Sequence, residues 1–401
     1  MTAPASTGPA STARRMQALA LATTAFLVNF WAWGMVSPLA TQYQSELGLS
    51  PFAVSALVAA PVLVGSLGRI PLGIAADRYG GRLVFGVTTL VTIVPVLLLA
   101  AVTSYPALLL GALLLGIGGA TFAIGVPFVN AWFPPHRRGL ALGLYGMGNV
   151  GTAVANFASP RIASAAGRPW AYLIVAIALA VVGVGFLLLA RNPPTPPAAA
   201  EPFSTRFRRA LALPATGQLA ALYAVTFGGF VAFGAYLPTY LQSAYGLPVT
   251  DAATRAAGFV LLATLARPVG GALADRLGGR VVVLATLAVV AVMAIVDAFR
   301  PVLPVATPAF LLMAVALGAG SGAVFALVAV LVPGQQVGTV TGLVGAAGGL
   351  GGFLPPIVMG LVFQATGSYA IGLMLLSDIA LAALVFASLR LTPVPRERST
   401  P

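Results

Sequence analysis

The chain has 401 residues, of which 59% are hydrophobic and only 7% are charged, and its mean hydropathy is +0.99. A water-soluble domain carries about a quarter charged residues, so a soluble fold is excluded. Nearly every stretch of about 20 residues is apolar, which is the length that an α-helix needs to cross a bilayer. We therefore expect an all-α polytopic membrane protein.

The charge of the chain is basic but dispersed. The net charge is +13, and all 21 basic residues are arginines that lie mostly in short segments between apolar runs. Nucleic-acid binding needs basic residues gathered on one solvated face, so that class is excluded. The chain has no cysteine and one histidine, His136, which excludes disulfides, thiol chemistry and a zinc site. We expect no cofactor and no metal.

Apolar length and the breaks at Gly, Pro and Arg predict twelve transmembrane spans. Their approximate centres are Val28, Pro61, Leu90, Gly119, Gly148, Ile177, Gly229, Leu262, Ala288, Gly318, Leu350 and Ala380. The first apolar run, from Met16 to Leu39, is too long for the hydrophobic core of a cleaved signal peptide. We therefore expect a polar tail followed by a membrane helix.

A proline- and arginine-rich stretch near the midpoint is too polar to insert and separates two groups of six spans. The expected parts are an N-terminal tail (1–15), a six-helix half (16–190), a linker (191–214), a second six-helix half (215–390) and a C-terminal tail (391–401). With a cytoplasmic N-terminus, 15 arginines fall on the cytoplasmic side, 4 on the other side and 2 within spans. The positive-inside rule then predicts cytoplasmic tails and a cytoplasmic (inner) membrane location.

The two halves repeat one another. Residues 69–82 read RIPLGIAADRYGGR and residues 267–280 read RPVGGALADRLGGR, with 8 of 14 positions identical at an offset of 198 residues. A second, weaker similarity relates Gly118–Pro134 to Gly320–Pro333. Two six-helix halves that start on the same side of the membrane are parallel repeats, related by a pseudo-two-fold axis along the membrane normal.

The repeated loops, DRYGGR and DRLGGR, resemble the loop signature G-x-x-x-D-R-x-G-R-R of the major facilitator superfamily. That resemblance implies a role in conformational gating for Asp77, Arg78, Arg82, Asp275, Arg276 and Arg280. Each aspartate is able to cap a neighbouring helix or to pair with an arginine across the contact between the halves. The alternative is that the two aspartates only satisfy the backbone of their own loops.

Arg69 and Arg267 are the most informative residues. Each precedes its loop aspartate by eight residues, about 12 Å along a helix, which places both near the middle of the membrane. An ionised side chain there costs at least about 2.5 kcal/mol and persists where it faces a cavity or a partner. The only acid clearly inside an apolar run is Asp378, in the twelfth span, and Asp297 lies near the end of the ninth. Unless one arginine reaches an interface or pairs with Asp378, the two form a site for an anion. Guanidinium favours planar oxyanions.

Glycine-rich stretches occupy the fifth and eleventh spans. The fifth places glycines around Asn149, and the eleventh contains GLVGAAGGLGGF over Gly342–Phe353. Such stripes are packing surfaces that let helix backbones approach closely. If they face one another across a central cavity, they also narrow it, so we expect a conformational role for Gly146, Gly148, Gly151, Gly345, Gly348 and Gly349.

Taken together, the chain resembles the nitrate/nitrite porter family of the major facilitator superfamily over nearly all twelve spans. The shared features are the arginines of spans two and eight, the FPPHRRG loop and the two glycine-rich stretches. The resemblance implies that Arg69 and Arg267 clamp the anion, that Tyr223, Phe227 and Phe122 wall the pocket and that Asn149 lies close to it. Phe325 is added because the repeat makes it equivalent to Phe122.

The expected function is therefore a secondary carrier of nitrate, nitrite or both, taking part in nitrate assimilation by antiport or proton-coupled symport. Small carboxylates, as in the oxalate/formate exchangers of the same superfamily, are the alternative cargo, because a doubly positive site also suits a dianion. Enzymatic chemistry is not expected, since no His, Cys or paired carboxylates converge within the spans. We expect the chain to function as a monomer in the bilayer. A channel and a proton relay through His136 are weaker alternatives.

Overall fold

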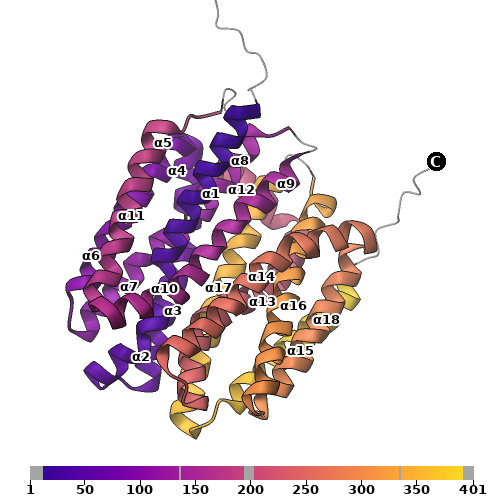
Figure 1. Cartoon of the computed structure of the whole chain (residues 1–401). Helices are drawn as coiled ribbons and strands as arrows, with labels where there is room; N and C mark the ends of the chain where they lie inside the picture. Colours follow the sequence, from indigo (N-terminus) through magenta and orange to yellow (C-terminus); the bar gives the residue numbers. More distant parts are fainter. Residues whose placement is uncertain (1–11, 135–136, 194–202, 334–335, 392–401) are drawn as a thin grey trace, which may run out of the picture.

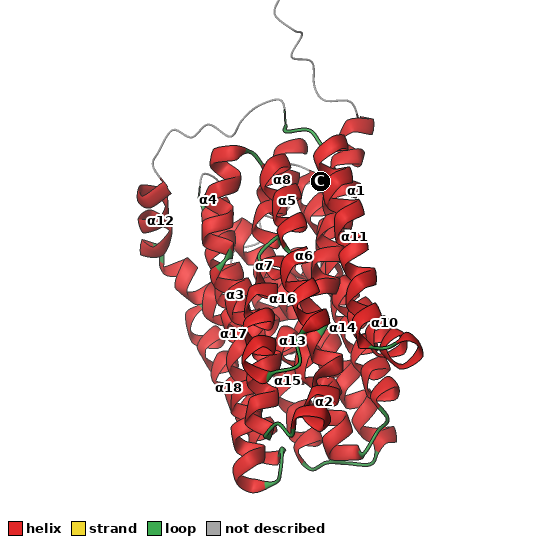
Figure 2. Cartoon of the chain, turned by 90° about the vertical axis from the view of Figure 1, so that its left-hand side faces the viewer, coloured by secondary structure: helices red, strands yellow, loops and turns green. Residues whose placement is uncertain are grey.

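The computed structural model describes residues 12–134, 137–193, 203–333 and 336–391, and every regular element in these ranges is a helix (Figure 2). In lipid each backbone polar group needs a partner within the protein, and a helix supplies that partner locally. Several sequence features discussed above lie outside the described residues: His136, the start of the N-terminal tail, most of the linker before residue 203, and the C-terminal tail from residue 392.

The helices of the first half are α1 (Thr12–Gly34), α2 (Val36–Leu47), α3 (Pro51–Leu67), α4 (Arg69–Tyr79), α5 (Gly81–Val91), α6 (Ile93–Ala101), α7 (Tyr105–Gly119), α8 (Phe122–Trp132), α9 (Arg138–Gly146), α10 (Val150–Ala166) and α11 (Arg168–Leu189). A short 3-10 turn, η2 (Met147–Asn149), joins α9 to α10. Linker helix α12 (Phe203–Ala212) follows. The second half contains α13 (Pro214–Tyr245), α14 (Val249–Leu277), α15 (Gly279–Ala298), α16 (Leu303–Leu331), α17 (Val337–Thr366) and α18 (Ala370–Arg390).

Eleven helices or helix pairs in the described residues are long and apolar enough to cross a membrane. The remaining expected span, the fifth, is the run α9–η2–α10, in which the 3-10 turn interrupts the helix. All twelve predicted centres lie within these helices or in this turn. The prediction of a twelve-helix membrane protein is therefore confirmed, and the interruption of the fifth span falls among the glycines around Asn149.

The internal repeat extends to the turns. Gly48 and Gly246 end helices with φ of 63° and 66°, and Gly80 and Gly278 form the loop turns with φ of 86° and 94°. Side-chain-bearing residues rarely adopt these angles, so glycine is needed at both copies of each turn. Figure 1 shows the first half, coloured indigo to magenta, beside the second, coloured mostly orange to yellow.

The two ends of the helix bundle are formed by different segments of the chain. We call the end that holds α12 and the loops after α4 and α14 the linker side, and the opposite end, where α2 meets α3, the distal side. Helices of opposite halves pack along one another in the pairs α3 with α17, α10 with α14 and α2 with α13. These contacts bring spans one, two, five, seven, eight and eleven to the interface between the halves.

Helices α14 and α16 approach so closely that their backbones touch. A Cβ atom added at Gly322 would lie 2.0 Å from the Arg267 carbonyl oxygen, and one added at Gly318 would lie 2.1 Å from that of Ala263. The same holds from the other helix, because a Cβ at Gly270 would lie 2.0 Å from the Ala319 carbonyl oxygen. These glycines fix the height and tilt of the helix that carries Arg267.

We predict that Gly322→Val separates α14 from α16 and destabilises the protein by about 1–3 kcal/mol, the usual penalty for overpacking. The matched control is Gly258→Val on α14, where an added Cβ meets nothing within 4 Å. The measurement is the thermal unfolding midpoint in detergent, which should fall for Gly322→Val only. Equal midpoints for the two variants would contradict the close approach.

Candidate anion-binding site

A break between α3 and α4 sets the direction of Arg69. The Ser66 hydroxyl donates to the Val62 carbonyl at 2.7 Å, a local bond of the kind that bends helices. Gly68 joins the two helices, and a Cβ there would lie 2.8 Å from the Val64 carbonyl oxygen, so the tight bend excludes larger residues. Arg69 follows directly and is only 5% exposed. The bend therefore places a cation in the interior of the bundle.

Arg69 reaches from the first half into the second. Its Nη1 donates to the carbonyl of Gly345 on α17, and its guanidinium carbon lies 5.3 Å from the centre of the Phe122 ring. A second ring, Phe227 of α13, lies 5.8 Å from the same carbon. Nε of Arg69 is buried and has no hydrogen-bond partner. One donor of Arg69 thus remains available to a ligand.

Arg267 stays within its own half. Its Nη2 donates to the hydroxyl of Tyr223 on α13 at 2.8 Å, and its guanidinium carbon lies 5.0 Å from the Phe227 ring centre. Nη1 of Arg267 is buried without a partner. Phe227 therefore lies near both guanidinium groups, and it links the two pseudo-symmetric arginines into one site.

The aromatic residues expected at the site do come together. Tyr223 and Phe227 stack with ring centres 4.9 Å apart and an interplanar angle of 5°, and Phe325 meets Tyr223 edge-on at 4.7 Å. Because the Tyr223 oxygen accepts a bond from Arg267, its own hydrogen is left to be donated. Phe122 lies near Arg69 on the side of the first half. The result is a cationic site with rigid aromatic walls.

Neither arginine has a carboxylate partner among the described residues. The ion pairs in this part of the chain include Arg168–Glu46, Arg206–Asp77 and Arg255–Asp251, and none of these involves Arg69 or Arg267. Asp378, considered above as a counterion, is exposed on α18, and Asp297 is buried at the distal end of α15. The described residues also contain no cluster of His, Cys, Asp and Glu able to hold a metal ion. The positive charge of the site is therefore left for a ligand to balance.

The glycines of α17 shape the site directly. A Cβ at Gly348 would lie 2.3 Å from Cδ1 of Tyr223, and one at Gly345 would lie 3.4 Å from Nη1 of Arg69. Gly349 faces the other half, where a Cβ would lie 2.2 Å from the Ser66 hydroxyl. This part of the stripe lets Tyr223 and Arg69 sit against the backbone of α17.

The glycines of the fifth span behave differently from one another. Gly148 packs against Phe26 and Gly151 against the carbonyl of Leu27, both on α1 of the same half. By contrast, Gly143 and Gly146, nearer the linker side, have nothing within 4 Å of an added Cβ. The expected close approach is thus present at Gly148 and Gly151 and absent at Gly146. Gly338 and Gly342 of α17 also face open space.

Asn149 lies in the 3-10 turn between α9 and α10, and this turn packs against α14, the helix of Arg267. Its Nδ2 donates to the Gly146 carbonyl at 2.8 Å, while its Oδ1 is buried without a partner. Asn149 forms no hydrogen bond with either arginine. Its amide stabilises the turn.

The repeated loops lie on the linker side, away from the arginine pair. Asp77 forms an ion pair at 3.2 Å with Arg206 of linker helix α12, and both Asp77 and its equivalent Asp275 are exposed. No side chain caps the N-terminus of α5 or α15, so the capping role considered for these aspartates is not found there. Of the arginines, Arg82 donates to the Leu187 carbonyl and Arg280 to that of Ser388, and Arg78 lies over the Tyr79 ring.

Two features of the site lie beyond sequence reasoning. The acceptor for Arg69 is the backbone carbonyl of Gly345. Every residue has a backbone carbonyl, so the amino-acid sequence does not indicate which one serves as the acceptor. Tyr145 was also missed: it stacks on Phe122 with ring centres 6.0 Å apart and on Phe26 at 4.8 Å. The only available signal was its position one turn before the glycine-rich turn of the fifth span.

Comparison with known proteins agrees with this geometry. The Major Facilitator Superfamily profile matches residues 22–354 and 219–401. A probable nitrate/nitrite transporter of Mycobacterium tuberculosis is 46% identical over 95% of this chain and 98% of its own length. The chain belongs to the nitrate/nitrite porter family of the major facilitator superfamily. Other relatives in this family are a nitrite extrusion protein of Bacillus subtilis (38% identical, 92% of both chains) and a probable nitrate/nitrite antiporter of Thermus thermophilus (35% identical, 86% of this chain and 84% of the relative).

Solved structures support the superfamily fold. A bacterial homologue of the human lysosomal transporter Spinster, in an inward-facing and occupied conformation, aligns with a TM-score of 0.74 at 19% identity over 95% of this chain and 97% of that chain. The human organic anion transporter MFSD10 aligns with a TM-score of 0.72 at 16% identity over 93% of this chain and 99% of that chain. At these identities the likeness concerns the fold alone.

We predict that Gly348→Ala weakens anion binding at least tenfold, because the new methyl group would occupy the place of the Tyr223 ring and pull its hydroxyl away from Arg267. The control is Gly342→Ala on the same helix, where a Cβ meets nothing within 4 Å. Nitrate binding to the purified protein, measured by titration calorimetry, distinguishes them. Unchanged affinity in Gly348→Ala, with the fold intact, would contradict the proposed role of Tyr223.

Proposed function

We propose that this chain is a secondary active carrier that exchanges nitrate and nitrite by alternating access. The observation that carries the proposal is the pair of enclosed arginines with unpartnered N–H donors and no carboxylate counterion in the described residues. The relatives named as nitrate/nitrite transporter, antiporter and nitrite extrusion protein support the choice of cargo over a small carboxylate.

A planar monoanion suits the contacts of the site. Guanidinium groups present flat forks of N–H donors, which bind planar oxyanions through parallel hydrogen bonds. Nε of Arg69, Nη1 of Arg267 and the Tyr223 hydroxyl supply donors from different directions. The Phe227 and Phe122 rings restrict the remaining space with apolar walls. Nitrate and nitrite are small and flat enough to accept from several of these donors at once.

The positive charge of the site links anion binding to the conformational change of the carrier. A bound anion offsets part of the positive charge and therefore lowers the energy of enclosing the arginines in a low-dielectric interior. The bond from Arg69 to Gly345 joins the two halves, and an anion competes for the same guanidinium. The occupied carrier thus changes conformation more readily than the empty one, which favours antiport. Exposed Asp378, remote from the site, gives no support to a proton relay.

We infer the orientation of the protein in the membrane from the distribution of arginines. Arginines are concentrated on the linker side, so this side faces the cytoplasm by the positive-inside rule, and both tails are cytoplasmic. Besides the bond from Arg69 to Gly345, hydrogen bonds between the halves lie on the distal side, for example Thr41 to Gln242 at 2.6 Å and Arg161 to Thr254 at 2.8 Å. The structure is therefore the outward-closed state of a carrier in the cytoplasmic membrane, and one chain contains the complete site, as a monomeric carrier requires.

We predict that Arg69→Lys and Arg267→Lys each reduce nitrate uptake into proteoliposomes by at least about 95%, because a point charge replaces a planar fork. The control is Arg255→Lys, since Arg255 pairs with Asp251 near the distal surface and takes no part in the site. Wild-type flux in both site variants, with thermal stability unchanged, would reject the proposed role of the arginines.

We also predict that nitrite on the opposite side accelerates efflux of labelled nitrate severalfold, whereas oxalate or formate does not, and that a pH gradient has little effect. Exchange requires an occupied carrier to return, so acceleration follows from the charge argument above. The same counterflow assay excludes the other mechanisms.

Each alternative leaves a distinct result in this assay. Acceleration by oxalate but not nitrite would transfer the chain to the carboxylate carriers. A strong dependence on the pH gradient, without acceleration, would indicate proton symport. Flux that follows the electrochemical gradient alone would indicate a channel.

A further inference from the structure

The first span of each half carries a proline at nearly the same place along its length: Pro38 and Pro238 are 200 residues apart, close to the 198-residue offset of the repeat. Pro38 follows the break between α1 and α2, and Pro238 lies within α13. Proline has no N–H, so it cannot bond to the carbonyl four residues earlier, which is Gly34 in the first half and Gly234 in the second. Each first helix therefore has a weak point on the distal half of the bundle.

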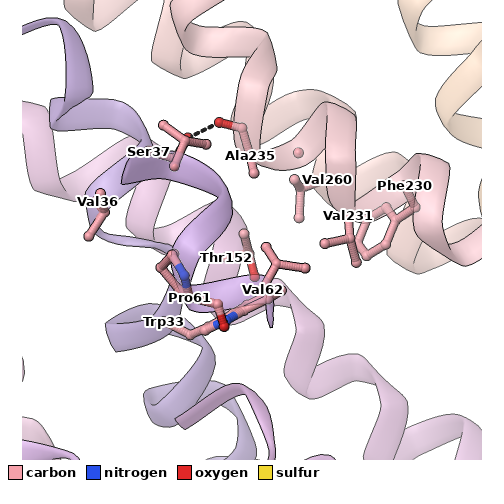
Figure 3. Close-up of a pocket in the computed structure, with 13 residues that line it drawn as sticks. Trp33, Val36, Ser37, Pro61, Val62, Thr152, Phe230, Val231, Ala235 and Val260 are labelled. Carbon is pink, nitrogen blue, oxygen red and sulfur yellow. Dashed lines mark hydrogen bonds between the residues drawn. The ribbon is translucent and has the colours of Figure 1, made fainter. Parts of the chain in front are cut away.

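These two weak points meet on the pseudo-two-fold axis. The Ser37 hydroxyl donates to the carbonyl of Ala235, and the two residues are separated by 198 positions, the offset of the repeat. Figure 3 shows this bond at the edge of a cavity between the halves. The contact joins α2 to α13 beside Pro38 and Pro238, where α1 ends and where the continuous helix α13 lacks one backbone bond.

A side chain of the opposite half supplies the donor that Pro238 lacks. Nδ2 of Asn156, on α10, donates to the Gly234 carbonyl at 3.2 Å. Asn156 is completely buried, and α10 belongs to the first half while Gly234 belongs to the second. The bond therefore exists only while the halves are together on the distal side. Moving them apart removes the amide from a carbonyl that lacks the usual backbone donor four residues later in its own helix.

The cavity beside these contacts is apolar. Its wall includes Trp33, Val62, Val231 and Val260 (Figure 3), and the repeat relates Val62 to Val260 and Trp33 to Val231. Val62 and Val260 precede Arg69 and Arg267 by seven residues, about 10 Å along a helix, so the cavity lies between the arginines and the distal contacts. An apolar constriction of this kind excludes hydrated ions when closed.

We propose that Asn156 and Pro238 form a distal latch, in which the Asn156 amide replaces the missing backbone donor and holds the carrier closed over the apolar cavity. The proposal rests on alternating access as proposed above. Opening requires the Gly234 carbonyl to exchange the amide for water entering between the halves. Other distal bonds between the halves, such as Thr41 to Gln242, join polar side chains that water replaces without leaving a backbone group unpaired.

The absence of cysteine from the chain allows a direct test in the native background. Val62→Cys places a thiol in the cavity wall, and a membrane-impermeant maleimide added on the distal side reports how often the cavity opens. Ser45→Cys, at an exposed position of α2, identifies the distal side in sealed vesicles. The labelling rate measures how accessible the cavity is from the distal side. It therefore does not depend on which anion the protein carries.

In the Val62→Cys background, Asn156→Ala should raise the labelling rate at least fivefold, because the closed state loses its amide. Pro238→Ala should raise it as well, because alanine restores the backbone N–H at this position and the Gly234 carbonyl no longer needs Asn156. The double variant should exceed neither single variant, since both changes act on one carbonyl. Asn29→Ala is the control, because buried Asn29 bonds to Ala25 and Thr89 within the first half.

Unchanged labelling in both single variants, or a double variant equal to the product of the two effects, would overturn the latch. If the Asn156→Ala variant does not fold, the labelling rate of Pro238→Ala alone tests the latch. This substitution changes the accessibility of the cavity without removing a buried polar side chain. Nitrate counterflow in the same vesicles separates the two proposals: no exchange by the unmodified chain would reject the cargo, and a labelling difference would still support the latch.

Discussion

Two arginine side chains enclosed between the halves of a membrane protein, without a counterion in the described residues, are the constraint on which the rest of the structure depends. Each such charge is expensive in a low-dielectric interior unless a partner is supplied. The nearby acids do not supply it: Asp378 is exposed on α18, and Asp297 lies at the distal end of α15. The bend at Gly68, the aromatic walls and the bare backbone of α17 all hold these charges where a ligand can balance them.

The two arginines occupy equivalent positions in the internal repeat, but their hydrogen-bond partners differ. Arg69 bonds across the interface to Gly345, whereas Arg267 bonds to Tyr223 within its own half. In the proposed mechanism both arginines present donors to the ligand, and Arg69 also joins the halves. Distally, the Asn156–Gly234 bond closes the pathway with neutral groups, so that charge is confined to the arginine site and to the surfaces.

The features that sequence predicts well are those in which residue type decides position. Apolar length predicted the spans, the duplicated DR-x-G-G-R loops revealed the repeat, and the depth of Arg69 and Arg267 followed from counting residues along a helix. The aromatic residues Tyr223, Phe227, Phe122 and Phe325 came from family resemblance and from the repeat, and the structure places them beside the arginines.

The features that could not be predicted from the sequence depend on backbone groups and on which face of a helix packs against a neighbouring helix. The Gly345 carbonyl has no residue-specific signal, and the open space beside Gly146 contrasts with the packed Gly148 only two positions on. Asn156 had a detectable signal, a buried amide in a membrane helix, but its partner became evident only when its side chain was found against the Gly234 carbonyl of α13.

An experimental structure of the protein with nitrate bound would test the role of the two arginines most directly. We predict one planar anion between the two guanidinium groups, within hydrogen-bond distance of Arg69, Arg267 and the Tyr223 hydroxyl, with the Phe227 ring beside it. Density for nitrate elsewhere in the bundle, or an arginine paired with a carboxylate while the anion is bound, would contradict it.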